Sequence, residues 1–95
     1  MSGTLTYWVH DGKNSLKSLR LTLLSEEDHG AGVAVTRRKR LGRIIEEAIW
    51  QGAKLSYHDL GMIMLTSKAT LKRDMNYLRR SGMLISTPRQ IEGEE

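Results

Sequence analysis

Two short segments near the N-terminus alternate between apolar and polar positions. The apolar positions are Leu5, Tyr7 and Val9 in the first segment and Leu19, Leu21 and Leu23 in the second. A period of two is typical of β-strands, and residues 11–14 between the segments are of types that favour turns. The pattern therefore predicts an antiparallel hairpin. Because a lone hairpin is barely stable, we expect it to pair in a sheet with a second copy or with the short apolar segments near Leu55 and Leu84.

A helical period follows an irregular connection, residues 25–35, which contains acidic residues and then glycines. The apolar residues that recur at the spacing of one helix face are Leu41, Ile44, Ile45, Ala48 and Ile49. Gly52 is a suitable residue to end this helix. We therefore expect a first helix from near Thr36 to near Gly52.

A capping signal marks the start of a second helix. Ser56 followed by Asp59 resembles a capping box, with Asp in place of the usual Glu. Leu60 and Met64 are expected on the buried side of this helix, with Ile63 as a further candidate.

A third helix is predicted directly after Thr66 and Ser67, which prefer caps to helix interiors. Its apolar stripe consists of Leu71, Met75 and Leu78, and Gly82 ends it. Residues 83–85 form a candidate strand that Pro88 breaks. From Gln90 onward we expect an acidic, disordered tail.

These elements predict an α+β chain in which a winged helix-turn-helix, with three helices and a short or incomplete wing, follows an N-terminal β-hairpin. The expected domains are residues 1–35 as hairpin and connection, serving as a dimerisation arm, residues 36–89 as the winged helix-turn-helix, and residues 90–95 as the tail.

The composition indicates where the protein is located and which class of partner it binds. The chain has 95 residues, no cysteine and no apolar run long enough for a membrane helix, so we expect a cytoplasmic protein. The net charge of +4 is unevenly distributed. The basic blocks are Arg37, Arg38, Lys39, Arg40 and Arg43, and Lys68, Lys72, Arg73, Arg79 and Arg80, whereas the acidic residues outside them include Glu26, Glu27, Asp28, Glu92, Glu94 and Glu95. Such segregation favours a polyanionic partner.

The third helix concentrates the positive charge on one arc outside its apolar stripe. The residues expected there are Lys68, Ala69, Lys72, Arg73, Asn76, Arg79 and Arg80. A charged arc is usually a solvated face, but such faces mix signs, and Asp74 is placed across the apolar stripe from this one. The major groove of DNA admits an α-helix whose Arg or Lys reaches guanine and whose Asn reaches adenine. We therefore predict that this helix binds double-stranded DNA.

The first basic block is expected to contribute an ancillary phosphate contact, through Arg38 in particular. Cations near a helix N-terminus are poorly placed unless an anion accompanies them, and a phosphate would supply that anion. The alternative is that these residues are simply the solvated first turns of the first helix.

The run from Thr66 to Met75, followed by Leu78, Gly82, Met83 and Leu84, resembles the helix-turn-helix of DeoR-type transcriptional regulators. That resemblance implies that Ser67 caps the recognition helix, that Thr70, Lys72 and Arg73 face DNA, and that Asp74 is a structural partner near the helix surface. From about Gly32 onward the chain also resembles an uncharacterised family of prokaryotic proteins that carry such a helix-turn-helix.

Two features depart from the DeoR-type pattern. In those regulators the domain is N-terminal and an effector-binding domain follows, whereas here a hairpin precedes the domain, and we expect no small-molecule effector domain in this chain. A full wing needs two strands after the third helix, and only residues 83–85 are convincing. Either the wing is truncated or another strand completes the sheet.

Other chemistry is weakly supported. His10, His29 and His58 lack metal-ligand spacing, so we expect no metal and no cofactor. Ser25, Asp28 and His29 do not by themselves establish a catalytic triad, and we expect no enzyme. Tyr7, Trp8 and Trp50 are expected in the core or an interface rather than as base-stacking platforms.

The sequence therefore predicts a sequence-specific DNA-binding protein, a transcriptional regulator, that acts as a homodimer to engage two half-sites. The alternative function is a winged-helix assembly module that binds protein and no DNA.

Overall fold

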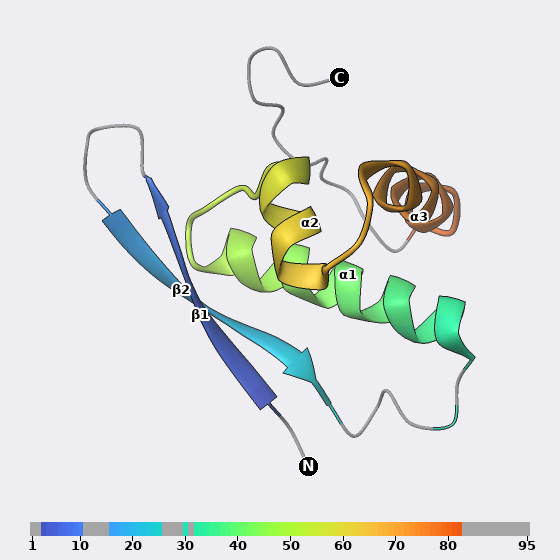
Figure 1. Ribbon diagram of the computed structural model, residues 1–95, viewed down its shortest axis with the longest axis horizontal. Coiled ribbons are helices and arrows are strands. Elements are labelled where there is room, and N and C mark those ends of the chain that lie inside the picture. The colour runs from blue at the N-terminus through green and yellow to red at the C-terminus, as the bar shows by residue number, and fades with distance from the viewer. Residues whose placement is uncertain (1–2, 11–15, 26–29, 31, 83–95) are drawn as a thin grey trace. The chain divides into compact units, whose positions relative to one another are not determined.

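The computed structural model describes residues 3–10, 16–25, 30 and 32–82, and shows an α+β chain in which an antiparallel hairpin precedes three helices (Figure 1). The elements are β1 (Gly3–His10), β2 (Leu16–Leu24), α1 (Val33–Trp50), α2 (Tyr57–Met64) and α3 (Lys68–Arg80). The chain divides into two compact units, Met1–Ala53 and Lys54–Glu95. The predicted hairpin and helix order are therefore confirmed.

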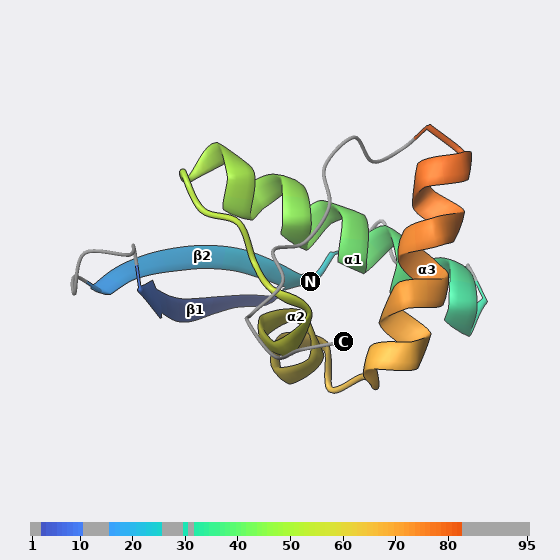
Figure 2. The same cartoon turned by 90° about the horizontal axis from the view of Figure 1, so that it is seen from above.

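The strands of the first unit pair antiparallel, as Figure 2 shows. Tyr7 lies opposite Leu19 and Trp8 opposite Ser18, and the register shifts between Gly3 and Thr4. Burial alternates along β1, and along β2 as far as Thr22, as the period of two predicts; Leu19 and Leu21 of β2 are the most deeply buried.

Helix α1 packs against β2 through the predicted apolar stripe. The fully or nearly fully buried side chains of this unit are Leu19, Leu21, Leu41, Ile44, Ile45 and Ala48. Burying each leucine contributes about 1.5 to 3 kcal/mol relative to leaving it in water. The fifth member of the stripe, Ile49, is 38% exposed and lies outside this core.

Two polar side chains of α1, and that of its C-cap residue Gln51, bond to the outer edge of β2. The amide of Arg20 donates to Gln51 Oε1 at 2.8 Å, and Gln51 Nε2 donates back to the Arg20 carbonyl at 2.8 Å. The amide of Thr22 donates to Glu47 Oε1 at 2.7 Å. Arg43 donates to the carbonyl oxygens of Thr22 and Leu23, at 3.2 Å each. Helix side chains thus replace the strand that this edge lacks.

The C-terminal end of α1 agrees with the prediction, whereas its N-terminal end does not. The helix ends before Gly52, which has a φ of +83°, as expected. It begins at Val33, earlier than Thr36, because Gly32 adopts an extended N-cap conformation and its carbonyl accepts from the Thr36 amide.

The second unit begins with the predicted capping box. The Ser56 side chain accepts from the amide of Asp59, and the Asp59 carboxylate accepts from the amide of Ser56, both at 3.0 Å. Helix α2 then ends at Met64, and its C-cap residue Leu65 adopts the left-handed conformation with a φ of +53°. This residue turns the chain toward α3.

Helices α2 and α3 pack together around one apolar cluster. Its buried members are Leu55, Tyr57, Leu60, Ile63, Leu71, Met75 and Leu78. A side chain at Gly61 would place its Cβ 3.2 Å from the Thr66 carbonyl oxygen, so the absence of a side chain permits the close approach of α2 to the connection.

Several expectations need correction or lie outside the described residues. The chain divides into its two compact units after Ala53, because the stripe of α1 packs on the hairpin, and the expected domain boundary at residue 36 stays a prediction. Trp8 and Trp50 are 60% and 76% exposed, so they do not belong to the core. Within the described residues the sheet of the hairpin consists of β1 and β2, and Ser56, next to Leu55, lies in an isolated β-bridge instead of a strand. The strand at residues 83–85, the break at Pro88 and the acidic tail lie outside those residues.

Candidate nucleic-acid interface

Helix α3 is delimited by local signals at both ends. The Ser67 side chain accepts from the amide of Thr70 at 3.3 Å, which confirms the expected N-cap. At the other end Ser81 is the C-cap and Gly82 has a φ of +75°, as expected for a helix stop. These caps fix which residues of α3 face the core of the second unit.

One side of α3 is buried and the opposite side is exposed. The buried residues are Leu71, Asp74, Met75 and Leu78, and the exposed residues are Ala69, Lys72, Arg73, Asn76, Tyr77, Arg79 and Arg80. We call this exposed set the α3 basic face. Asp74 is the single acidic residue of α3 and is 0% exposed, so the basic face carries no negative side chain. The resemblance placed Asp74 near the helix surface, and the structure buries it instead.

The cations of the basic face differ in how they are held. Lys72 Nζ lies 5.9 Å from the centroid of the buried Tyr57 ring, within cation-π range. Arg79 Nη1 donates to Asn76 Oδ1 at 3.2 Å. In the part of the chain that the structure describes, Arg73 and Arg80 have no hydrogen-bond or ion-pair partner. Two guanidinium groups therefore remain available to an external anion.

The position of two cations also suits the helix itself. Arg79 and Arg80 lie in the last turn of α3, where the carbonyl end of the helix carries partial negative charge. Positive charge there stabilises the helix while remaining exposed to solvent. The helix dipole therefore favours both of these cations.

Three predicted contact residues border the basic face rather than lying at its centre. Ser67 is exposed, and its hydroxyl donates to Thr70 Oγ1 at 3.0 Å. Thr70 and Lys68 are half-buried. Nine of the ten predicted residues thus lie on α3 or its N-cap.

The tenth, Arg38, is half-buried on α1 in the first unit. Its neighbour in the same basic block, Arg43, is engaged with the β2 carbonyls described above. One member of the block thus has a structural role that spacing along the sequence does not reveal.

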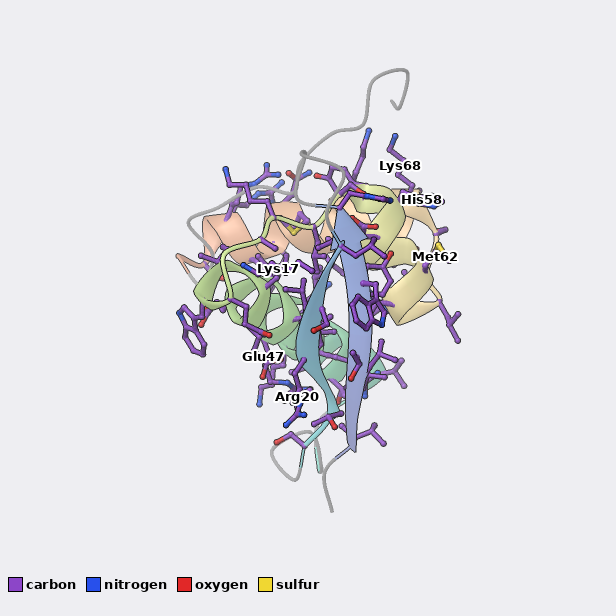
Figure 3. The ribbon with its side chains drawn as sticks, turned by 90° about the vertical axis from the view of Figure 1, so that its left-hand side faces the viewer. Lys17, Arg20, Glu47, His58, Met62 and Lys68 are labelled. Atoms are coloured by element: carbon purple, nitrogen blue, oxygen red, sulfur yellow. The ribbon has the colours of Figure 1, made fainter. Side chains whose placement is uncertain are left out.

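The exposed side of α2 is a feature that the sequence analysis missed. His58 and Met62 point outward from α2 in Figure 3, and Met62 and Leu65 are 58% and 90% exposed. Their i, i+4, i+7 spacing was visible in the sequence. In contrast to α3, this side carries apolar groups and no Lys or Arg.

The remaining candidates gain no support. Among the described residues no group of three His, Cys, Asp or Glu side chains is placed to hold a metal ion. Asp28 and His29, of the weighed triad, lie outside those residues. No helix in the described part of the chain is long and apolar enough to cross a membrane.

Comparison with known proteins identifies a family. A family model described as "Protein of unknown function (DUF1670)" matches residues 7–92, which include β2 and all three helices. No curated protein and no solved structure matches the chain. Because the match spans most of the sequence, the chain belongs to the DUF1670 family.

Proposed function

We propose that this protein binds double-stranded DNA sequence-specifically and acts as a transcriptional regulator, with α3 in the major groove. The observation that carries the proposal is the composition of the α3 basic face. Its four cations and one amide lie on one side of a helix whose single carboxylate is buried. A solvated helix face usually mixes charges of both signs, whereas a groove-binding face is selected against negative groups that would repel phosphate.

The chemistry of this face suits base recognition. A B-DNA major groove is about 12 Å wide and accommodates one helix. Arginine donates in pairs to guanine O6 and N7, and asparagine can bond adenine through both its oxygen and its nitrogen. We assign base contacts to Arg73 and Asn76, and phosphate contacts to Lys72 and Arg80.

The local architecture of the second unit supports the same function. Helices α2 and α3 are joined by residues 65–67, close to the turn of about three to four residues that defines a helix-turn-helix. The capped start of α2 and the close approach at Gly61 hold α3 against its partner helix. In the proposed winged helix-turn-helix, α2 positions α3 and α3 contacts the bases.

The decisive experiment removes two cations from the basic face. In the Lys72→Ala and Arg73→Ala double variant we expect loss of specific DNA binding in a fluorescence anisotropy titration, with the fold retained. Both residues are exposed, so each substitution should change stability by no more than about 0.5 kcal/mol. The matched control is Arg20→Ala with Lys54→Ala, which removes the same charge from exposed positions outside α3.

Salt dependence separates the roles of the two residues. A lost phosphate contact should make the slope of log affinity against log salt shallower by about 0.9 for all sequences. A lost bidentate contact to guanine should cost about 1 to 3 kcal/mol and relax preference at one base. If the folded double variant keeps wild-type affinity, salt slope and preference, α3 is not the DNA interface.

A protein-assembly function is the second candidate, and the exposed side of α2 favours it. Met62 and Leu65 present apolar groups to solvent, and Leu65 does so from a left-handed backbone. This function predicts that no duplex from a random pool binds, at any salt concentration. Selection from such a pool therefore discriminates between the two functions.

A further inference from the structure

The two outer edges of the β-hairpin differ in whether their backbone groups are hydrogen-bonded. On the β2 edge, the backbone groups of Arg20 and Thr22 are bonded by Arg43 and Glu47 of α1 and by its C-cap residue Gln51. In an antiparallel pair, residues whose backbone groups point away from the partner strand alternate with residues that bond to it. Because the backbone N–H and C=O groups of Arg20 and Thr22 point away from β1, they determine which residues of the hairpin direct their backbone groups outward.

Their partners across the hairpin are the outward residues of β1. Thr6 lies opposite Arg20 and Thr4 opposite Thr22, so by alternation Trp8 and His10 also direct their N–H and C=O groups away from β2. Within the described residues, no hydrogen bond is made by these outward groups. The β1 edge is thus open where the β2 edge is covered.

Apart from the register shift between Gly3 and Thr4, β1 lacks the devices that protect a free edge. Gly3–His10 is eight residues long and contains no Lys, Arg, Asp, Glu or Pro. Natural edge strands are usually short, charged, bulged or covered, since a long neutral edge pairs with other chains. The side of β1 that continues the buried face is also only half-buried at Leu5, Tyr7 and Val9, whereas Leu19 and Leu21 of β2 are 0% exposed.

We propose that β1 pairs antiparallel with β1 of a second copy of this chain, joining two hairpins into one four-stranded sheet. A two-fold axis at Tyr7 gives the longest overlap of the outward backbone groups, with Thr6 opposite the second copy's Trp8 and Thr4 opposite its His10. Because the strand is neutral, no like charges of β1 meet across this axis. The pairing also brings the half-buried apolar side chains of the two β1 strands next to each other on the same face of the sheet.

A second copy is favoured over a foreign strand because the interface is self-complementary. A two-fold interface uses the same surface on both subunits, and an antiparallel strand pair satisfies that condition with itself. This inference goes beyond DNA binding and stands or fails without it, since it concerns a different unit of the chain.

Sedimentation of the full chain tests the pairing. We expect wild type at twice the chain mass of 10.8 kDa. Thr6→Pro removes an outward N–H that the hairpin does not use, and Trp8→Lys adds a charge beside the open edge. Each substitution should raise the dissociation constant of the dimer at least about tenfold, while the circular dichroism spectrum remains unchanged.

The matched control is Ser18→Lys, which places the same charge on the residue opposite Trp8, away from the open edge. This variant should remain dimeric. A monomeric wild type, or a folded Trp8→Lys variant that dimerises normally, overturns the proposal. Equal dissociation of Ser18→Lys also overturns it, because the effect would then belong to charge and not to the edge.

Cross-linking tests the register in the same chain, which has no native cysteine. A single Tyr7→Cys variant brings two thiols together at the two-fold axis, and should form a disulfide-linked dimer on mild oxidation. Val9→Cys, on the same face, lies opposite Leu5 of the second copy and should not. Absence of the Tyr7→Cys cross-link in a dimeric protein overturns this arrangement.

Discussion

Leu65 is the described non-glycine residue with a positive φ, and the strain it carries has a measurable size. A left-handed conformation costs an L-residue about 1 to 2 kcal/mol, because Cβ approaches a carbonyl oxygen. Gly52 and Gly82 adopt similar φ values without a Cβ. Leu65 gains little in return, since its side chain is 90% exposed. The fold therefore tolerates this residue, and does not depend on its side chain.

Leu65→Asn should stabilise the protein by roughly 0.5 to 1 kcal/mol, since Asn enters the left-handed region more readily than other side chains. For a chain of this size the melting temperature should rise by several degrees, about 4 to 8 °C per kcal/mol. Leu65→Ala is the control, because it removes the same exposed side chain but keeps the backbone strain. A melting temperature for the Asn variant no higher than that of the Ala variant would contradict the strain argument.

Capping residues were predictable from the sequence because their bonds are local. Ser56 with Asp59, and Ser67 with Thr70, bond across three residues within one turn. The burial of Asp74 was not predictable in this way, because a helical wheel places a residue beside an apolar stripe without giving the depth of the surrounding core. The contact of Lys72 with Tyr57 likewise depends on how α2 packs against α3.

At the scale of elements, the covered edge of β2 depends on polar residues of α1 that the apolar period does not explain. Glu47→Ala should destabilise the protein by about 1 to 2 kcal/mol in chemical denaturation, because the part-buried Thr22 amide loses a charged acceptor. Glu47→Gln keeps an acceptor oxygen and should cost less. Glu46→Ala removes the same charge from an exposed neighbouring position and should be close to neutral. An equal effect of Glu46→Ala and Glu47→Ala would show that charge alone matters.

The type and order of the described elements followed from their periodicity, but their grouping did not. The stripe of Leu41, Ile44 and Ala48 predicts that α1 buries one face, and it is silent on which element receives that face. The structure joins α1 to the hairpin through apolar contacts and through the edge bonds of Arg43 and Gln51. Such bonds connect residues far apart in the chain, so no local pattern contains them.

At the scale of the molecule, the two proposed interfaces lie on different units. The open edge belongs to β1 in Met1–Ala53, and the basic face belongs to α3 in Lys54–Glu95. We therefore expect that substitutions can remove the proposed dimerisation and the proposed DNA binding separately. A single DNA-binding module of the proposed kind buries only about 600 to 1,000 Å² of protein surface on DNA, so under the proposal two copies on two half-sites would give the specificity that one lacks.

Selection from random duplexes should expose this division of roles. Wild type should enrich inverted repeats whose half-sites are spaced by about 34 to 36 Å, one helical turn, or a multiple of it. A folded Trp8→Lys monomer should enrich the same motif as a single half-site, with weaker binding, because its α3 is unchanged. The Lys72→Ala and Arg73→Ala variant should remain dimeric and enrich no motif. If dimeric wild type enriched only single half-sites, the β1 pairing would not be the device that sets DNA specificity, even though both interfaces existed.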